Sequence, residues 1–441
     1  MTAPGILVAA LRSGAGKTTV TLGLLRALAR RGLRVSGVKC GPDYIDPAFH
    51  AAATGRESFN LDSWTMETEL LGQLALRAGE EADIIVAEGA MGLFDGVPGA
   101  PAQTGASADI AAHLGWPVLL VMDVSGQAQS AAAIAHGVAL YDARVKLAGV
   151  LLNRVGSERH RKLAQEAIEA IGIKIFGTLP RDQGIALPER HLGLVQAGET
   201  PGLDSLLDRL AEHIESHVDI DALIAAAAGG SPDVGHAPLD IPRPRGGRIA
   251  VARDEAFSFF YPHLARGWRE TGADIVFFSP LTDEPPPEDC DACWLPGGYP
   301  ELHAGRLAAA QRFLGGLRRF AATRPIHGEC GGYMTLGRTL IDAAGAAHEM
   351  AGLLDLTTSF AQRKLHLGYR RARLLGDCAL GAAGDALAGH EFRYATIVSE
   401  KGQPFAMVTD AYSQEERPAG LRAGLVTGSF FHAMTKKKGR R

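Results

Sequence analysis

The chain has 441 residues, of which 46% are hydrophobic and 21% charged, so it is long enough for two or three globular domains with large cores. The 45 lysines and arginines nearly balance 49 acids, which argues against nucleic acid and acidic membranes as partners. No apolar run reaches membrane-spanning length, and the chain lacks the basic start of a signal peptide. The five cysteines show no disulfide-framework spacing, which predicts a reducing, cytoplasmic location.

The first half of the chain alternates predicted strands and helices. A buried strand at 5–11 leads through a glycine loop into a helix at about 17–31. Further runs predict strands at 34–40, 83–89, 117–124 and 146–155, and helices at 127–140 and 157–171. Apolar strands that alternate with helices predict a parallel sheet with both faces covered.

A segment rich in Gly, Pro and Asp at about 228–246 has the composition of a linker. After it the alternation restarts, with strands at 247–253, 273–280, 292–298 and 325–332, helices at 262–271 and 304–322, and a last strand-rich run at 424–434. The sequence therefore predicts an α/β fold of two domains, with a boundary near residue 245.

The stretch ALRSGAGKT at 10–18 follows the first predicted strand and has the character of a phosphate-binding loop. Glycines let backbone amides turn toward a phosphate, a lysine reaches its β and γ oxygens, and a threonine hydroxyl coordinates Mg²⁺. The match is imperfect, because the usual first glycine is Ala10 or Leu11 here. The residues predicted to hold ATP are Ser13, Gly14, Ala15, Gly16, Lys17, Thr18 and Thr19.

Five acids follow predicted strands and are expected at the same sheet edge as this loop. A lone Asp at a strand end is often a helix cap, but five together indicate metal or phosphate chemistry. They are Asp43, Asp46, Glu88, Asp95 and Asp123, and Thr18 would complete the metal site with Asp43, Asp46 and Glu88. Asn153 closes another strand, where it is either a purine contact or a turn residue.

The segment GPDYIDP at 41–47 carries two of these carboxylates between prolines. It is either a rigid turn or a fixed loop with metal ligands and substrate contacts, and the residues alone leave both interpretations open. On the second interpretation, Tyr44 and Ile45 touch the substrate.

The segment Gly328–Gly332 places Cys330 in a G-x-C-x-G pattern typical of a nucleophile elbow, where a tight strand-to-helix turn presents the thiol. The glycine turn in LPGGYPE predicts oxyanion donors at Gly298, alongside Gly331. His432 is the predicted general base, with His327 and His390 as weaker alternatives.

The pair Cys290 and Cys293 has the spacing of a redox or zinc site. No second Cys or His pair has suitable spacing for zinc. The pair also runs into a predicted strand rather than opening a helix, so strand residues are the favoured interpretation.

Together these residues resemble the a,c-diamide synthases of corrinoid biosynthesis, over nearly the whole chain. The shared motifs are, in order, GPDYIDP, EGAMGLFDG, ALPERHLGL, LPGGYPE, HGECGGYM, GHEFRY and the late His. The resemblance implies an ATP domain like that of dethiobiotin synthetase at 1–195, a helical segment and linker at 196–246, and a class I (flavodoxin-like) glutamine amidotransferase domain at 247–437. It also implies ATP- and glutamine-dependent amidation of the a and c acetates of a corrinoid polycarboxylic acid, through acyl phosphates, by a homodimer.

The resemblance also implies residue roles. Lys17 and Thr18 would hold ATP and Mg²⁺, Cys330 would attack glutamine, and His432 would activate the thiol. Asp43, Asp46, Glu88 and Asp95 would serve the metal, phosphoryl transfer or the substrate. Many triad amidotransferases carry Glu two residues after the His, where this chain has Met434, so the third triad member stays open.

Other assignments remain possible. Hydrogenobyrinic acid is the favoured substrate, but no single residue excludes cobalt-containing cobyrinic acid. Cobyric acid synthase is disfavoured, because it lacks GPDYIDP in this form. A partitioning or metal-insertion ATPase with an inactive amidotransferase-like domain is a different class of function, and the intact Cys330 and His432 argue against it.

Overall fold

The structure is a computed structural model that describes residues 3–182, 184–185, 189–190, 193–229, 235 and 237–437. The chain divides into two compact units, Met1–Ala237 and Pro238–Arg441. Most of the motif at 186–194 lies outside the described residues. None of the helices in this described part combines the length and apolar character that a membrane span needs.

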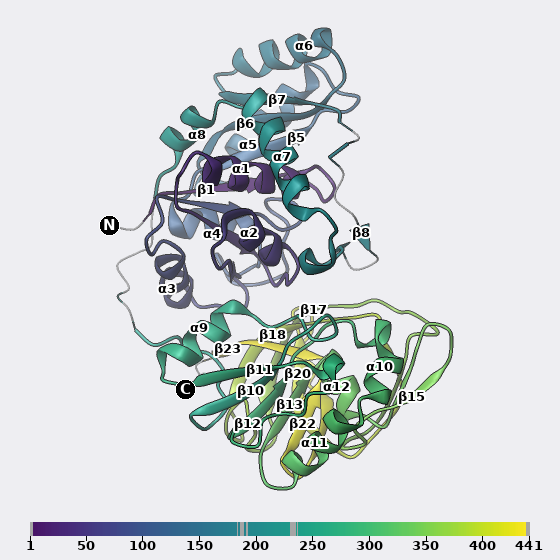
Figure 1. Ribbon diagram of the computed structural model, residues 1–441. Coiled ribbons are helices and arrows are strands. Elements are labelled where there is room, and N and C mark those ends of the chain that lie inside the picture. The colour runs from purple at the N-terminus through teal and green to yellow at the C-terminus, as the bar shows by residue number, and fades with distance from the viewer. Residues whose placement is uncertain are drawn as a thin grey trace. The chain divides into compact units, whose positions relative to one another are not determined.

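The first unit is built on a parallel sheet in the order β3-β2-β4-β1-β5-β6-β7, of which Figure 1 labels β1, β5, β6 and β7. The strands are β1 (Gly5–Ala9), β2 (Val35–Cys40), β3 (Phe59–Leu61), β4 (Ile84–Glu88), β5 (Val118–Asp123), β6 (Leu147–Val155) and β7 (Ile175–Pro180). All of their pairings are parallel, which confirms the predicted sheet. The carboxyl ends of these strands therefore share one edge, where the register sets Lys39 beside Glu88.

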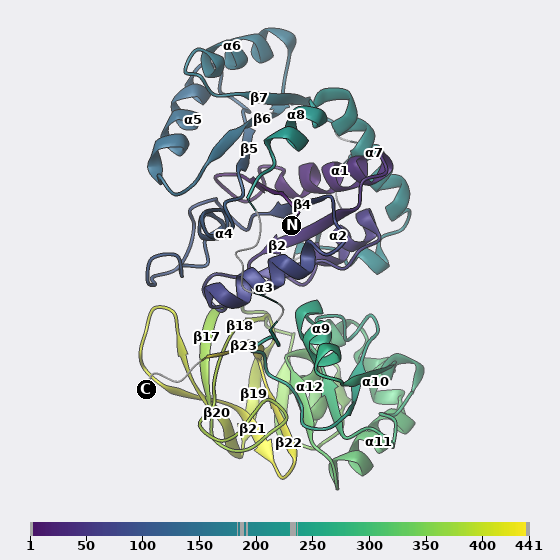
Figure 2. The ribbon, with the colours of Figure 1, turned by 90° about the vertical axis from the view of Figure 1, so that its left-hand side faces the viewer.

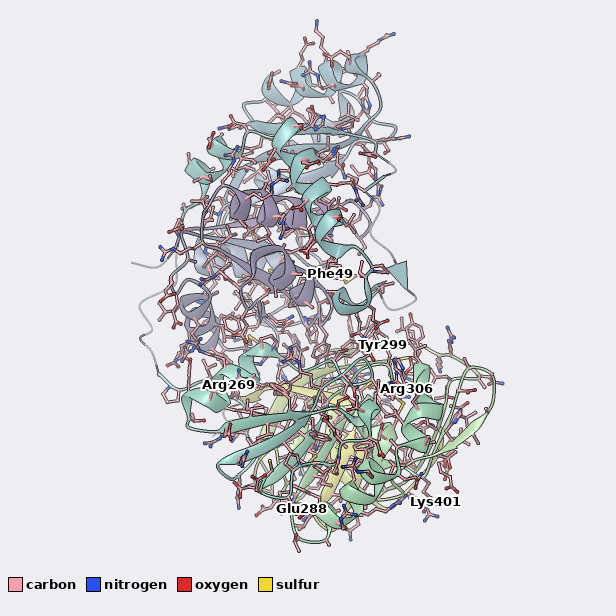
Figure 3. The ribbon with its side chains drawn as sticks, in the orientation of Figure 1. Phe49, Arg269, Glu288, Tyr299, Arg306 and Lys401 are labelled. Atoms are coloured by element: carbon pink, nitrogen blue, oxygen red, sulfur yellow. The ribbon has the colours of Figure 1, made fainter. Side chains whose placement is uncertain are left out.

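Helices flank this sheet (Figures 1 and 2). They are α1 (Lys17–Arg30), α2 (Asp46–Thr54), α3 (Thr68–Ala78), α4 (Ser107–Leu114), α5 (Ser130–Tyr141), α6 (Glu158–Glu169), α7 (Leu203–His217) and α8 (Ile220–Ala226), with a 3₁₀ turn at Ala197–Glu199 and a short hairpin of β8 (Glu189–Arg190) and β9 (Gly193–Leu194). Their apolar faces pack on the strands, and Phe49 of α2 is fully buried (Figure 3).

The helix α7 belongs to the first unit and packs against α1. A Cβ on Gly23 of α1 would lie 2.5 Å from the Ile214 side chain, so the two helices approach closely because this position is glycine. Arg26 and Asp208 pair beside the contact at 2.8 Å. The helical part of the segment 196–246 is thus integrated into the core of the first unit.

The second unit contains a sheet in the order β11-β10-β12-β13-β22-β21-β20-β17-β18-β23. The first five strands pair in parallel and the others pair antiparallel. The parallel strands are β10 (Arg248–Ala252), β11 (Asp274–Phe278), β12 (Ala292–Leu295), β13 (Ile326–Glu329) and β22 (Val426–Ser429). The antiparallel strands are β17 (His366–Leu374), β18 (Ala386–Arg393), β20 (Gln403–Asp410), β21 (Arg417–Ala423) and β23 (Phe431–Lys437). The parallel half was predicted, and the antiparallel extension was not.

A smaller sheet of β14 (Thr339–Ile341), β15 (Ala347–Glu349), β16 (Asp355–Ser359) and β19 (Thr396–Lys401) completes the strands of this unit. Its helices are α9 (Pro262–Glu270), α10 (Ala304–Ala309), α11 (Gln311–Ala321) and α12 (Gly331–Leu336), with 3₁₀ turns at Pro280–Thr282 and Pro300–Leu302 (Figure 2). The prediction of one helix at 304–322 is wrong, because Ala310 has non-helical angles (φ −77°, ψ 72°) and separates α10 from α11.

The large sheet curls so that its last strand returns to its middle. The backbone amide of Ala433 in β23 donates a hydrogen bond of 2.9 Å to the side chain of Glu329 at the end of β13, although five strands separate β13 from β23 in the sheet order. Residues about a hundred positions apart in the sequence, Cys330 after β13 and His432 in β23, are brought together by this return.

Candidate functional site

The loop between β1 and α1 turns on two glycines with positive φ. Gly14 has φ +73° and Gly16 has φ +97°, a region that glycine adopts without strain. Lys17 begins α1, and its Nζ donates hydrogen bonds to the backbone oxygens of Arg12 at 3.1 Å and Met91 at 2.5 Å. The ammonium group therefore folds back over the loop, at the helix N-terminus where a phosphate binds favourably.

Two residues at the end of β6 brace this loop. Asn153 Nδ2 donates to the oxygen of Ala15 at 2.8 Å, and Arg154 Nη2 donates to the oxygen of Gly14 at 2.9 Å. A Cβ on Gly16 would lie 2.3 Å from Asn153 Nδ2, so this close approach requires glycine. The contact of Asn153 with a purine stays a prediction.

A buried cluster of charged and polar side chains lies next to the loop, and we call it the carboxylate cluster. Its centre is Glu88 at the end of β4, which is fully buried. Thr18 Oγ1 donates to Glu88 Oε1 at 2.6 Å, and His50 Nε2 lies 2.8 Å from Oε2. Lys39 Nζ lies 3.1 Å from Glu88 Oε1 and 2.5 Å from Asp46 Oδ2.

The charges within the carboxylate cluster do not balance, because one Lys39 ammonium faces two buried carboxylates. Burial by itself would raise the pKa of Glu88, but the interactions with Lys39 and His50 lower it by more. The resulting pKa of Glu88 lies well below its usual value. Burial and the nearby Asp43 raise the pKa of Asp46 to about 8, although Lys39 opposes this shift. Of the two carboxyl groups that face Lys39, Glu88 therefore ionises more readily than Asp46.

The two carboxylates of GPDYIDP have different surroundings. Asp43 Oδ1 accepts hydrogen bonds from the backbone amides of Ile45 at 2.7 Å and Asp46 at 3.0 Å, which fixes the turn into α2. Asp46 instead joins the carboxylate cluster. Tyr44 is half-buried, and Ile45 is only 8% exposed. The segment is thus a rigid turn that also carries a member of the cluster.

Two other predicted acids have their own partners. Asp95 Oδ2 accepts a hydrogen bond from the amide of Gly92 at 2.9 Å, within an exposed loop. Asp123 pairs with Arg12 at 2.6 Å and Arg154 at 2.7 Å. Asp123 therefore holds two arginines beside the phosphate loop.

The donor set fits a Mg²⁺ ion that binds together with a nucleotide. Mg²⁺ prefers oxygen ligands and commonly uses one or two carboxylates, with phosphate oxygens and water for the rest. Thr18, Asp46 and Glu88 offer such oxygens. Over the residues that the structure describes, no group of three or more His, Cys, Asp or Glu is placed to hold a metal ion by itself.

The turn at Cys330 is a strained strand-to-helix elbow. Cys330 has φ +47° and ψ −100° between β13 and α12, a conformation that costs a non-glycine residue about 1–3 kcal/mol. A Cβ on Gly328 would lie 2.6 Å from Leu336 Cδ1, and one on Gly332 would lie 2.0 Å from the oxygen of Leu295. Both glycines are therefore required for the turn to pack.

His432 and Cys330 converge over Gly297. A Cβ on Gly297 would lie 2.6 Å from His432 Cε1 and 3.4 Å from Cys330 Cβ. Burial lowers the pKa of His432, but its interactions with Cys330 and Glu329 raise it to about 9. A protonated imidazole beside a thiol favours the thiolate, which is the nucleophilic form.

The two predicted oxyanion donors are neighbours. A Cβ on Gly331 would lie 3.1 Å from the amide nitrogen of Gly298, and Gly331 directly follows Cys330. A Cβ on Gly298 would lie 2.1 Å from the oxygen of Ala256, so this turn also needs glycine. Tyr299, the residue after Gly298 and labelled in Figure 3, packs edge-on against Phe259, and the ring centroids are 5.1 Å apart. Backbone amides placed this way suit the negative oxygen of a tetrahedral intermediate.

The alternative bases are buried and uncharged. His390 stacks on His432 with ring centroids 4.9 Å apart, and its Nε2 lies 2.7 Å from Tyr261 Oη. Burial and the charge of His432 hold the pKa of His390 well below its usual value. His327 Nδ1 lies 2.9 Å from Thr427 Oγ1, and the same two causes lower the pKa of His327 to about 3. Neither side chain replaces His432 beside the thiol.

Cys290 and Cys293 are structural in character. Cys293 lies in β12, and both Cys290 and Cys293 are buried and free of disulfides. Burial raises the pKa of Cys290 to about 11, so this thiol stays protonated and unreactive.

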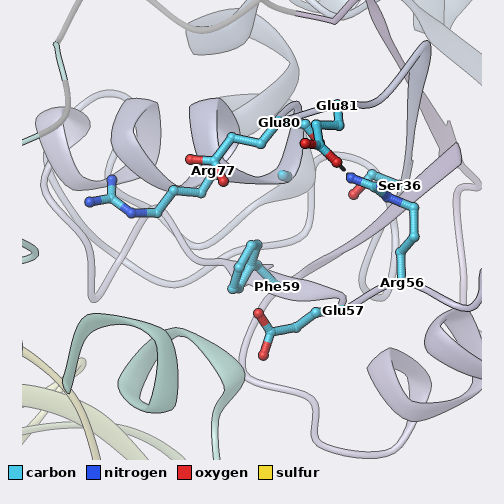
Figure 4. A pocket seen from close by; sticks show the side chains of 8 residues that line it. Ser36, Arg56, Glu57, Phe59, Arg77, Glu80 and Glu81 are labelled. Carbon is cyan, nitrogen blue, oxygen red and sulfur yellow. Dashed lines mark hydrogen bonds between the residues drawn. The ribbon is translucent and has the colours of Figure 1, made fainter. Parts of the chain in front are cut away.

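The first unit also contains a pocket of about 550 Å³ that shares no lining residue with the phosphate loop or the carboxylate cluster (Figure 4). It is lined by Ser36, Arg56, Glu57, Phe59, Arg77, Ala78, Glu80 and Glu81. Ser36 lies near the start of β2, whereas Lys39 of the carboxylate cluster lies near its end. The pocket therefore opens at the other end of the strand from the phosphate loop.

Sequence reasoning missed three residues of these sites. Lys39 and His50 join the carboxylate cluster, and Glu329 contacts His432 with an Nδ1–Oε2 distance of 3.7 Å. A charged residue inside an otherwise apolar strand, as at Lys39 and Glu329, was the available signal, because such residues are rarely buried without a partner.

Two family models match the chain, one in each of the two structural units. Residues 6–195 match the CobQ/CobB/MinD/ParA nucleotide binding domain, and residues 248–439 match the CobB/CobQ-like glutamine amidotransferase domain.

Three curated relatives, each named hydrogenobyrinate a,c-diamide synthase, match over almost their entire length. The protein of Mesorhizobium japonicum is 56% identical and covers 99% of both chains. That of Agrobacterium fabrum is 56% identical over 99% of this chain and 100% of the relative. That of Rhodobacter capsulatus is 54% identical over 97% of this chain and 98% of the relative. With identity above one half along nearly the whole sequence, this chain belongs to the hydrogenobyrinate a,c-diamide synthase family.

Proposed function

We propose that this protein uses ATP and glutamine to amidate the a and c acetate carboxylates of hydrogenobyrinic acid, as a carbon–nitrogen ligase of cobalamin biosynthesis. The main support is that one chain carries both a phosphate loop with its carboxylate cluster and a Cys330–His432 elbow. Relatives that align with both parts bear the name of this reaction.

In the first unit, the proposed step makes a carboxylate reactive. A substrate carboxylate oxygen attacks the γ-phosphorus of ATP, which forms an acyl phosphate and releases ADP. Lys17 and the backbone amides of 13–16 hold the phosphates, with Thr19 following on α1, and Lys39 offers a second positive charge for the transferring group. A Mg²⁺ ion held by Thr18, Asp46 and Glu88 would neutralise phosphate charge. Tyr44, Ile45, Asp46 and Asp95 are the residues that we assign to substrate contacts.

In the second unit, the proposed step releases ammonia from glutamine. The Cys330 thiolate attacks the side-chain amide carbon, and the amides of Gly298 and Gly331 hold the oxyanion. His432 gives a proton to the leaving nitrogen, and ammonia departs. Water then hydrolyses the thioester, which returns the thiol and releases glutamate.

Ammonia attacks the acyl phosphate carbon and displaces phosphate, a far better leaving group than hydroxide.

The boundaries 1–195, 196–246 and 247–437, a homodimer and a cytoplasmic location are part of the same proposal. The family matches at 6–195 and 248–439 support the outer boundaries. The free cysteines among the described residues support a reducing compartment.

The decisive experiment is mass spectrometry of the product formed by the purified protein from hydrogenobyrinic acid or cobyrinic acid, with ATP and either glutamine or ammonia. We expect a diamide from hydrogenobyrinic acid. Cys330→Ala should lose glutamine-dependent product and keep ammonia-dependent product, because the acyl phosphate still forms. Product from cobyrinic acid alone would change the substrate, and no diamide from either would exclude the ligase.

A further inference from the structure

The buried carboxylate of Glu329 lies directly beneath the proposed glutaminase pair. Glu329 is the last residue of β13, immediately before Cys330, and only 2% of it is exposed. Its Oε1 accepts the hydrogen bond from the Ala433 amide at 2.9 Å, and its Oε2 lies 3.7 Å from His432 Nδ1. The carboxylate is thus oriented by one oxygen and faces the imidazole with the other.

A buried carboxylate is costly without a positive partner. Within the described structure, the ion-pair neighbours of Glu329 are His432 and His327, whose Nε2 lies 4.0 Å from Oε1. His327 stays neutral, because burial and the charge of His432 lower its pKa to about 3. His432 is therefore the group whose positive charge compensates Glu329.

We propose, on the basis of the function proposed above, that Glu329 is the third member of the glutaminase triad and the positioning residue for His432. Met434 occupies the position two residues after the histidine, where many triad amidotransferases carry the carboxylate. In this chain the carboxylate comes from β13 instead of β23, and the curl of the sheet brings the two strands together.

The chemistry of the triad explains what Glu329 does. An ionised carboxylate only accepts hydrogen bonds, so it keeps a proton on Nδ1 of His432 and leaves Nε2 as the base. Nε2 takes the proton of the Cys330 thiol, and the carboxylate stabilises the resulting imidazolium. The same proton then passes to the amide nitrogen of glutamine when ammonia leaves. The separation of 3.7 Å is longer than a hydrogen bond, and such contacts commonly shorten when substrate binds.

A purely structural role would use only the hydrogen bond to Ala433. Glu329→Gln separates the two roles, because its amide oxygen still accepts from that amide while its NH₂ group faces Nδ1. An NH₂ donor that faces Nδ1 requires Nδ1 to act as an acceptor, so the proton of neutral His432 lies on Nε2. Nε2 then no longer accepts the proton of the Cys330 thiol. The equivalent change in a serine protease triad costs about 10⁴-fold in kcat.

The test is glutaminase kinetics of the full-length Glu329→Gln protein, with thermal unfolding as a check of the fold. We expect kcat to fall about 100-fold or more, with KM for glutamine within about threefold, and ammonia-dependent amidation unchanged. Asp342→Asn is the matched control, because it removes another His–carboxylate pair, His348–Asp342 at 2.8 Å. Its glutaminase rate should equal that of the wild type.

Two results would overturn the proposal: a Glu329→Gln kcat within about threefold of the wild type, or an equal loss of ammonia-dependent amidation and thermal stability. Cys330→Ala is run in parallel. If it retained glutaminase activity, the glutamine half of the proposed function would fail, whereas loss in Cys330→Ala together with a normal Glu329→Gln would defeat only the triad assignment.

Discussion

The carboxylate cluster of the first unit and the Cys330 elbow of the second both contain buried carboxylates, but the positive partners of those carboxylates differ. In the cluster, Lys39 lies between Asp46 and Glu88, and Lys17 is close enough to interact with both carboxyl groups, so two lysines are in place before any phosphate binds. At the elbow no lysine or arginine pairs with Glu329 among the described residues, and the only cation is His432.

This difference follows from the two chemistries. Phosphoryl transfer keeps its negative charge throughout, so fixed cations stabilise it best. Glutamine hydrolysis needs a group that gains and loses a proton within each cycle. The stacked His390, which stays neutral, leaves His432 as the titrating imidazole of that site.

The largest expected effect is that of Lys17→Ala on the first unit. It removes the ammonium that folds back over the phosphate loop, so amidation should fall about 10³-fold or more with either glutamine or ammonia. Glutaminase activity should remain. The measurement is product formation with both nitrogen sources beside ammonia release from glutamine. The control is Lys162→Ala, which removes an exposed lysine that pairs with Glu166. Normal amidation in Lys17→Ala would show that the phosphate loop does not take part in the reaction.

Glu88→Gln tests whether the cluster is also a structural centre. It takes a full charge from Thr18, Lys39 and His50 at once. Removing one member of a buried ion pair typically costs about 3–5 kcal/mol, so the free energy of unfolding of the first unit and the amidation rate should both fall. Urea unfolding is the measurement. Glu166→Gln, on the surface, should change stability by less than about 0.5 kcal/mol. An equally small change in Glu88→Gln would contradict a structural role.

The local parts of both sites could be predicted from the sequence, because short motifs specify them. Gly14, Gly16 and Lys17 define a loop after a strand, and the glycines around Cys330 define an elbow. In each case neighbours in the sequence are neighbours in space.

The parts that depend on tertiary structure could not be predicted. Lys39 and Glu88 meet because β2 and β4 pair in one register. Glu329 meets His432 only because a sheet with an unforeseen antiparallel half curls back on itself. Asp43 was predicted to be a metal ligand, but its Oδ1 accepts hydrogen bonds from two backbone amides. No pattern in the sequence distinguishes an aspartate that caps a turn from one that binds a metal ion.

A smaller effect is expected from Asp46 on the pH dependence of stability. Its pKa is raised to about 8 in the folded protein, against about 3.9 in an unfolded chain. Between these values the folded state binds the extra proton, so this group makes stability fall as pH rises from about 4 to about 8. Asp46→Asn should flatten that decline by up to about 1 kcal/mol per pH unit.

Urea unfolding of the first unit at pH 5, 6, 7 and 8, followed by pulse proteolysis, measures this slope. Asp83→Asn is the control, because its hydrogen bond to Arg34 lowers the pKa of Asp83 to about 2. That group contributes stability above about pH 4, which is lost as pH falls toward about 2, so its removal leaves the slope above pH 5 unchanged. An Asp46→Asn slope identical to that of the wild type would mean that Asp46 is ionised at neutral pH.

The smallest effect concerns Asn153, and it decides whether the phosphate loop is held in place by the neighbouring strand β6. Asn153→Ala removes one hydrogen bond to Ala15, worth about 1 kcal/mol, so KM for ATP should rise about fivefold. A bracing residue affects every nucleotide equally, whereas a purine contact discriminates between bases. We therefore expect the ratio of KM for ATP to KM for GTP to stay at its wild-type value. Arg154→Ala, which loses the parallel contact to Gly14, should behave in the same way. A changed ratio in Asn153→Ala alone would show that Asn153 reads the base, and the loop would then be held mainly by Arg154 and its own glycines.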